Sequence, residues 1–166
     1  FYGLNDESLA SIIINLLRER EETLAIAESC SGGGLGSALT EVPGSSDVFL
    51  GGVIAYSNLI KTKILGIPEK TIEEFGAVSN EVVELMAKNI SKKFNSDWAI
   101  AISGVAGPSG GTSNKPIGYV QFCISGPGII KSSSENFGSH KGRIEIQKLS
   151  VVRALDKLRL FLLSNS

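Results

Sequence analysis

The chain has 166 residues, of which 42% are hydrophobic and 20% charged, and its formal net charge at pH 7 is -1. A chain of this size and composition can bury a sizeable core, so we expect one globular domain over 1–166. A nearly neutral chain with a pI of about 5.9 lacks the positive field that holds nucleic acid or an anionic membrane surface, so a small molecule is the favoured partner.

The two cysteines, Cys30 and Cys123, form neither a CxxC pair nor a disulfide-rich pattern, which favours a reducing compartment. No run approaches the ~18 to 20 apolar residues of a membrane span, and no charged-then-apolar leader precedes the first expected helix. These features predict a cytoplasmic chain. Because it starts at Phe1 rather than Met, we expect a processed chain or a domain excised from a longer protein.

Helical and strand patterns alternate in the first two thirds of the chain. Apolar residues at helical spacing predict four helices, three of which begin at a Ser, Asn or Asp that can act as cap. They run from Asp6 or Ser8 to about Arg20, over 33–39, from Ser57 or Asn58 to Leu65, and from Ser79 to about Phe94. Short apolar runs predict strands over 23–27, 49–56 and 98–102. Gly51 and Gly52 either weaken the second strand or mark a bulge.

The last third predicts a hairpin and a closing helix. Residues 117–124 alternate between two faces, with Ile117, Tyr119, Gln121 and Cys123 on one of them, and we expect them to pair with 129–137 across Gly126, Pro127 and Gly128. A long helix follows from Arg143. This order of elements predicts an α/β fold with three layers, in which helices cover both faces of a mixed, mostly parallel sheet.

Three turns at the ends of the expected parallel strands carry the unusual residues of the chain. They cover 28–34, 56–61 and 103–111. Ligands of such sheets bind outside the carboxyl ends of the strands. If the three strands are neighbours, the three turns therefore form one pocket.

The first of these turns, AESCSGGG, places three candidate nucleophiles before a run of glycines. Ser29, Cys30 or Ser31 could belong to an active site, the N–H groups could hold a phosphate or an oxyanion, or the segment could be only a strand-to-helix turn. The glycines at 32, 33, 34 and 36 do not give GxGxxG, and GxxxxGK is absent. Dinucleotide-binding and kinase-like functions therefore lose their main support.

A serine nucleophile needs a base. His140, the single histidine, lies in the polar run GSHKG and is poorly placed for that role. Lys61 is the alternative, because one helical turn after the second strand its ammonium could reach back over the sheet, and burial would lower the pKa of a lysine. Tyr56 could hydrogen bond with it. The competing interpretation is that Lys61 and Lys63 simply face solvent.

Other residues have a functional and a structural interpretation side by side. Glu28 could orient the turn or accept a hydrogen bond from a substrate, Cys30 could attack or only fill space, and Arg143 could clamp a phosphate or lie on the surface. The glycines of GVAGPSGG could admit a ligand or only form a tight turn. No cluster of His, Cys and carboxylates has the spacing of a metal site, and no cofactor is expected.

Four motifs in this order, AESCSGG, YSNLIK, GAVS and GVAGPSGG, make the chain resemble the carboxyl-terminal domain of the CinA family, which also occurs as a free-standing nicotinamide mononucleotide amidase. The resemblance covers nearly the whole chain. Even FYGLNDESL is similar to the joint between the two domains of full-length CinA, which implies a missing amino-terminal domain. A homodimer is the oligomeric state that the family implies.

The resemblance implies hydrolysis of the carboxamide of nicotinamide mononucleotide to nicotinate mononucleotide and ammonia, a reaction of pyridine nucleotide salvage that needs no metal or organic cofactor. Ser29 would be the nucleophile and Lys61 its base, with Tyr56 close by. The residues expected to contact substrate are Glu28, Cys30, Ser31, Gly32, Gly33, Ser103, Gly104, Gly107, Gly110, Gly111 and Arg143.

The sequence departs from the family pattern near its end. KGR stands where the family has a glycine-acid-arginine turn, so Arg143 is the matching arginine, and Gln147 replaces a second frequent arginine. This departure and the start without Met favour the alternative function, a non-catalytic nucleotide-binding or assembly module that serves an amino-terminal partner domain.

Overall fold

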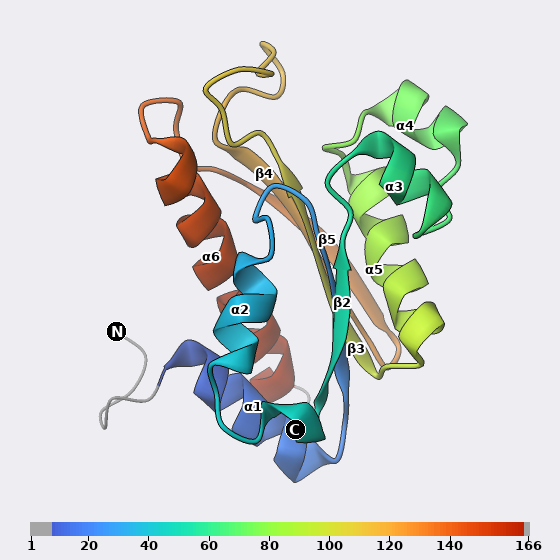
Figure 1. Ribbon diagram of the computed structural model, residues 1–166, viewed down its shortest axis with the longest axis vertical. Helices are drawn as coiled ribbons and strands as arrows, with labels where there is room; N and C mark the ends of the chain where they lie inside the picture. The colour runs from blue at the N-terminus through green and yellow to red at the C-terminus, as the bar shows by residue number, and fades with distance from the viewer. Residues whose placement is uncertain (1–7, 165–166) are drawn as a thin grey trace.

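A five-stranded sheet separates two layers of helices in the computed structural model, which describes residues 8–164 (Figure 1). The spatial order is β2-β1-β3-β4-β5. β1 pairs in parallel with β2 and with β3, whereas β4 is antiparallel to both β3 and β5. The expected three-layer α/β/α fold with a mixed sheet is confirmed. The strands are β1 (Leu24–Glu28), β2 (Phe49–Ile54), β3 (Trp98–Gly104), β4 (Tyr119–Gly126) and β5 (Ile129–Asn136).

The helices divide between the two faces of the sheet. One layer holds α1 (Leu9–Arg20), α2 (Gly34–Thr40) and α6 (Arg143–Ser164), and the other holds α3 (Asn58–Lys63), α4 (Glu69–Phe75) and α5 (Asn80–Phe94) (Figure 1). A short 3-10 turn, η1 (Ser45–Asp47), precedes β2. Ser8, Ser57 and Ser79 cap α1, α3 and α5 through their hydroxyls, as the sequence predicts. Asp6, the other candidate cap of α1, lies outside the described residues.

The central strand β1 is buried along its whole length and contributes to both cores. Leu24 and Ile26 face the layer of α1, α2 and α6, while Ala25 and Ala27 face the layer of α5. Side chains of a strand alternate between the two faces. The next residue in the second series is Ser29, which therefore emerges on the α5 side at the carboxyl end of the strand.

β2 approaches β1 closely and ends early. A Cβ atom on Gly52 would lie 2.2 Å from the carbonyl oxygen of Ile26, so this position requires glycine. The register between β1 and β2 shifts by one residue, because Leu24 pairs with Phe49 whereas Ala25 pairs with Gly51. This shift confirms the expected irregularity near Gly51 and Gly52. The strand stops at Ile54, two residues before the predicted Tyr56. Its early end frees the carbonyl groups of Ala55 and Tyr56 from the ladder.

Two other element boundaries differ from expectation. β4 begins at Tyr119 rather than Ile117, because the N–H of Tyr119 turns back to the carbonyl of Pro116 and that of Gly118 bonds to Val105. The segment after Pro68, for which the sequence predicts no type of structure, is the short helix α4. This helix faces α3 in the layer that covers the carboxyl end of β1.

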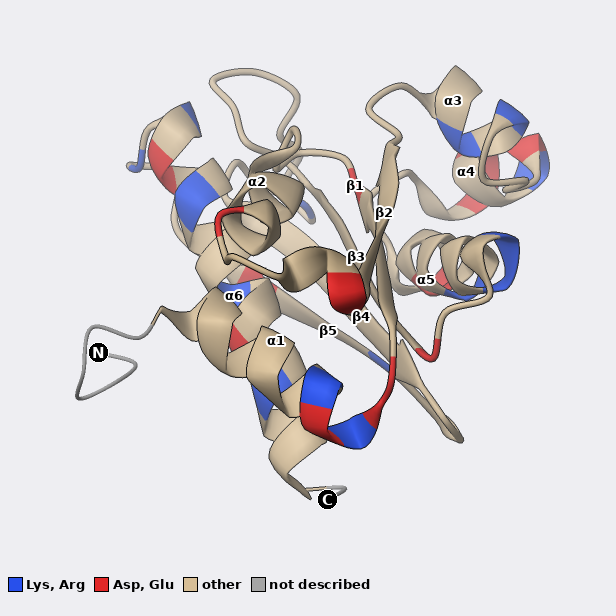
Figure 2. Cartoon of the chain, turned by 60° about the horizontal axis from the view of Figure 1, so that its bottom comes forward, with Lys and Arg blue, Asp and Glu red and all other residues tan. Residues whose placement is uncertain are grey.

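Charged side chains lie mainly on the helices and connecting turns of both layers (Figure 2). The longest described helix, α6, carries charged residues along its length, among them Glu145, Lys148, Arg153 and Lys157. Within residues 8–164, no helix is at once long enough and apolar enough to cross a membrane.

Candidate active site

The sheet register aligns Ser29 with the ends of its two neighbouring strands. Glu28 pairs with Ile54 of β2 and Ile102 of β3, which places Ser29 beside Ala55 and Ser103. The N–H of Ser29 donates to the carbonyl of Ile102 (3.0 Å), so the backbone of the candidate nucleophile is fixed by the ladder. The sequence expectation that three strand ends converge is confirmed for these residues.

Lys61 meets Ser29 at this edge of the sheet. Its Nζ lies 2.9 Å from Ser29 Oγ, 2.9 Å from the carbonyl oxygen of Ala55 and 3.2 Å from that of Tyr56. The residue is only 1% exposed, whereas Lys63 lies on the exposed side of α3. Lys61 is therefore a buried amine next to a buried hydroxyl.

Burial lowers the pKa of Lys61 to about 8, because the charged ammonium loses its hydration. A neutral amine has two N–H donors and one lone pair. The two carbonyl groups can take both donors, which leaves the lone pair facing the hydroxyl of Ser29. The environment of Lys61 thus suits a general base.

Ser29 and Lys61 open into a pocket of about 290 Å³. Its walls come from the first turn, from the start of α3, from the connection between α4 and α5, from the end of β3 and from the start of α6. The lining residues are Ser29, Cys30, Tyr56, Asn58, Lys61, Ala77, Val78, Ser103, Gly104, Ala106 and Arg143.

The carboxylate of Glu28 fills the position where the sequence allows a phosphate. It accepts hydrogen bonds from the hydroxyl of Ser31 and from the N–H groups of Gly33, Leu35 and Gly36. Gly33 adopts a φ of 98°, which brings its N–H into this arrangement and favours glycine. The N–H groups at the start of α2 are therefore not free for a phosphate, because an internal carboxylate already accepts their hydrogen bonds.

We expect the Glu28→Gln variant to lose about 2 to 4 kcal/mol of unfolding free energy. The neutral amide would replace one acceptor oxygen by an NH₂ group that confronts backbone donors, and the residue is only 1% exposed. Urea denaturation measures the change, with Glu41→Gln at an exposed position as the matched control. Equal stability of the two variants would contradict the assigned role of Glu28.

Cys30 and Ser31 differ from Ser29 in their surroundings. Burial raises the pKa of the Cys30 thiol to about 12, so the thiol stays protonated at neutral pH. The hydroxyl of Ser31 is bound to Glu28 at 2.7 Å, away from Lys61. Of the three successive candidates, Ser29 is the one that contacts the lysine of lowered pKa, whereas the carboxylate that holds Ser31 also accepts hydrogen bonds from three backbone N–H groups.

Tyr56 and Arg143 form a bridge at the rim of the pocket. The guanidinium of Arg143 donates to the phenol oxygen of Tyr56 at 2.6 Å and to the carbonyl of Gly107. The expected hydrogen bond between Tyr56 and Lys61 exists, but it uses the backbone carbonyl of Tyr56 rather than its phenol. The bridge joins the segment after β2, the second glycine turn and α6.

The second glycine turn contributes only its first part to the pocket. Ser103 and Gly104 line it, and the hydroxyl of Ser103 donates to the carbonyl of Ala77 at 2.9 Å. Gly107 contacts Arg143 through its carbonyl. Gly110 and Gly111, which are also expected to contact substrate, lie exposed and are not among the residues that line this pocket.

Four lining residues are not among the candidates from the sequence. Asn58 is considered there only as a helix cap, but Ser57 takes that role and leaves the Asn58 amide at the pocket. Ala77 and Val78 belong to the quoted motif GAVS, which is the signal that could have identified them. Ala106 likewise belongs to the quoted motif GVAGPSGG, although only the glycines of that motif are considered there.

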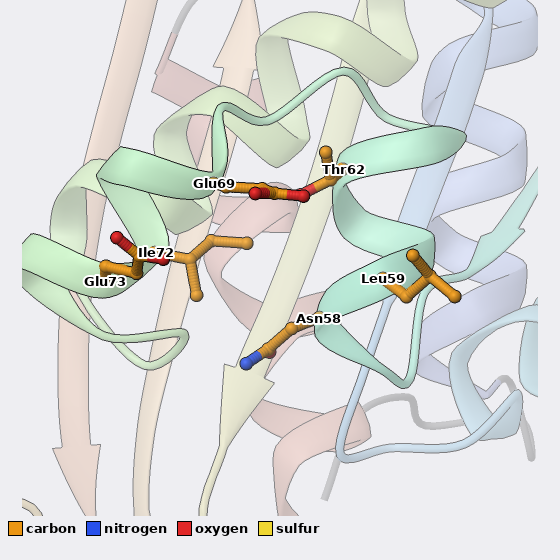
Figure 3. Close-up of a pocket in the computed structure, with 6 residues that line it drawn as sticks. All are labelled: Asn58, Leu59, Thr62, Glu69, Ile72 and Glu73. Carbon is orange, nitrogen blue, oxygen red and sulfur yellow. The ribbon is translucent and has the colours of Figure 1, made fainter.

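A second cavity of about 290 Å³ lies between α3 and α4 and shares Asn58 with the first (Figure 3). Its polar lining includes Thr62, Glu69 and Glu73. Two carboxylates disfavour an anionic ligand, and no lysine lines the cavity beside the hydroxyl of Thr62. The chemistry of the first pocket is therefore not continued here. Among residues 8–164, no group of three or more His, Cys, Asp or Glu side chains is arranged to hold a metal ion.

Comparison with known proteins gives a consistent result. Residues 6–162 match the family model described as the CinA C-terminal domain. A CinA-like protein from Prochlorococcus marinus is 58% identical over 165 residues, which is 99% of this chain and 39% of the relative. A CinA-like protein from Parasynechococcus marenigrum is 52% identical over 99% of this chain and 39% of its own length. The chain thus spans about two fifths of the length of these curated relatives.

Solved structures show the same fold. A competence/damage inducible protein from Agrobacterium tumefaciens is 35% identical, with a TM-score of 0.88 and 93% of each chain covered. A competence-damaged protein (CinA) superfamily protein from Klebsiella pneumoniae is 31% identical, with a TM-score of 0.89 over 94% of this chain and 96% of the other.

Proposed function

The chain belongs to the family of the CinA C-terminal domain, and from this premise we propose that it is an amidohydrolase that converts nicotinamide mononucleotide to nicotinate mononucleotide and ammonia. The observation that carries the proposal is the buried contact of 2.9 Å between Lys61 Nζ and Ser29 Oγ. A hydroxyl paired with an amine of lowered pKa is the arrangement of a serine-lysine nucleophile.

Acylation begins when neutral Lys61 takes the proton of Ser29 Oγ while that oxygen attacks the carboxamide carbon. The resulting tetrahedral intermediate carries its negative charge on the former carbonyl oxygen, which backbone N–H groups stabilise. Lys61 then returns the proton to the nitrogen as the C–N bond breaks and ammonia leaves. Ser29 is left as an ester of the nicotinate group.

Deacylation repeats these steps with water. Lys61, neutral again after ammonia has taken the proton, removes a proton from the water that attacks the ester carbon. Collapse of the second intermediate returns the proton to Ser29 Oγ and releases the carboxylic acid, which loses its remaining proton to solvent and becomes the carboxylate. No step requires a metal ion or an organic cofactor.

Arg143 suits the phosphate end of this substrate. It is the cationic side chain at the pocket rim, whereas Lys61 lies at the floor. Two of its N–H donors are used by Tyr56 and Gly107, and a guanidinium has five. The remaining donors can bind a phosphate oxygen while the carboxamide lies against Ser29.

The test is release of ammonia from nicotinamide mononucleotide by the purified chain. We expect turnover of the nucleotide and little or none of free nicotinamide, because the phosphate supplies binding energy that positions the amide. Thermal unfolding with and without the nucleotide is measured in parallel. Thermal stabilisation by the nucleotide without release of ammonia would support the non-catalytic binding function instead. Absence of both stabilisation and ammonia release would contradict both functions.

A further inference from the structure

The first turn leaves the N–H of Ser31 without an acceptor, and the N–H of Cys30 faces only the thiol of its own residue. The five N–H groups from Gly32 to Gly36 all bond within the turn, to the carbonyls of Ser29 and Ser31 or to the carboxylate of Glu28. In the described part of the chain, the N–H groups of Cys30 and Ser31 have no such partner. Both directly follow Ser29, where an oxyanion would form.

A side chain from α6 holds the peptide between these two residues. Gln147 Nε2 donates to the carbonyl oxygen of Cys30 at 3.0 Å. α6 belongs to the layer opposite α3, which carries Lys61 (Figure 1). The carbonyl and the N–H of a planar trans peptide point in opposite directions. Drawing the Cys30 carbonyl toward α6 therefore turns the N–H of Ser31 away from α6, toward the side of Lys61.

We propose that Gln147 is a positioning residue for catalysis, which fixes the Cys30–Ser31 peptide so that the N–H groups of Cys30 and Ser31 bind the oxyanion. The proposal rests on the amidohydrolase function. Glu28 holds the far side of the same peptide through the hydroxyl of Ser31, so the peptide is anchored at both ends. Neither Glu28 nor Gln147 is among the residues that line the pocket of Ser29 and Lys61.

The test replaces Gln147 by methionine, which has a similar length but no donor. Because loss of one oxyanion donor costs about 100- to 1000-fold in kcat, a loosened donor is expected to cost about 10- to 100-fold, with KM changed less than about twofold. Lys148→Met is the matched control at an exposed position one residue along α6 and should retain the original kcat. Gln147→Arg keeps N–H donors and should recover most of the lost kcat.

A second measurement tests the oxyanion site by the affinity for an inhibitor, without substrate turnover. 3-Pyridylboronic acid can form a B–O bond with Ser29 Oγ while Lys61 takes the proton, giving a tetrahedral anion. We expect its dissociation constant, measured by calorimetry, to rise about tenfold or more in Gln147→Met and to stay unchanged in Lys148→Met. A kcat and a boronate affinity within twofold of the original protein would overturn the role of Gln147.

The two proposals fail in different ways. If the unaltered chain releases no ammonia yet binds the boronate and loses this affinity in Gln147→Met, the substrate assignment is wrong and the positioning role stands. If the unaltered chain is active and Gln147→Met equals it in both measurements, only the positioning role is wrong.

Discussion

Ammonia release from nicotinamide mononucleotide is expected to fall at least about 10,000-fold when Ser29 is replaced by alanine, because no covalent intermediate can then form. The side chain is small and only 6% exposed, and its backbone is held by the ladder to Ile102. The fold should therefore survive the change. Steady-state kinetics and thermal unfolding of the same preparation separate lost chemistry from lost structure.

Neighbouring substitutions provide the controls for Ser29→Ala. Cys30→Ala removes a thiol whose pKa of about 12 keeps it protonated, and it should retain activity to within about tenfold. An inactive Cys30→Ala beside an active Ser29→Ala would transfer the nucleophilic role to the cysteine. In addition, mass spectrometry after treatment with a fluorophosphonate should find the adduct on Ser29 and none on Ser31.

Local patterns predict those parts of the molecule that depend on neighbours in sequence. Ser8, Ser57 and Ser79 cap their helices because a cap needs only the N–H group three residues later. Likewise, helical spacing separates Lys61 from Lys63 by about 200° around α3, and the structure buries the first while exposing the second. The spacing therefore predicts that the two lysines face opposite sides of α3, and the fold determines that Lys61 is the one that faces the sheet.

The role of Glu28 depends on the shape of the turn and is not readable in this way. A carboxylate before a glycine run can face a ligand or its own backbone, and only the three-dimensional path of residues 31–36 decides between them. The bridge from Arg143 to Tyr56 spans 87 residues and joins two exposed side chains. Periodicity contains no information about such a contact, because it depends on how α6 packs against the sheet.

The choice among three successive nucleophiles likewise needs the fold. From the sequence alone, Ser29, Cys30 and Ser31 are equally good candidates for the nucleophile. The alternation of β1 turns Ser29 toward the layer of α3, while the turn that follows directs the hydroxyl of Ser31 to Glu28. The hydrogen bond to Lys61 is thus a consequence of strand parity combined with the early end of β2.

Replacing Lys61 by methionine is expected to lower kcat about 1000- to 10,000-fold and to remove the pH dependence of the reaction near pH 8. Because burial lowers the pKa of Lys61 to about 8, only about a tenth of the amine is neutral at pH 7. The kcat/KM of the unaltered chain should therefore rise severalfold between pH 7 and 8.5 and then level off. A kcat/KM that stays constant over this pH range would contradict the role of Lys61 as base. The same rise of kcat/KM in Lys61→Met would also contradict it.

The same titration changes the stability of the protein in a predictable direction. Unfolding returns Lys61 toward its usual pKa of 10.5, so between pH 8 and 10.5 the unfolded chain binds more protons than the folded one. The unfolding free energy of the unaltered chain should rise across this window relative to Lys61→Met, by up to about 3 kcal/mol. Below pH 8 the buried ammonium carries its full penalty, so methionine should be the more stable residue there. Urea denaturation at pH 7 and pH 10 measures the difference, with Lys63→Met, at an exposed position, showing no such change.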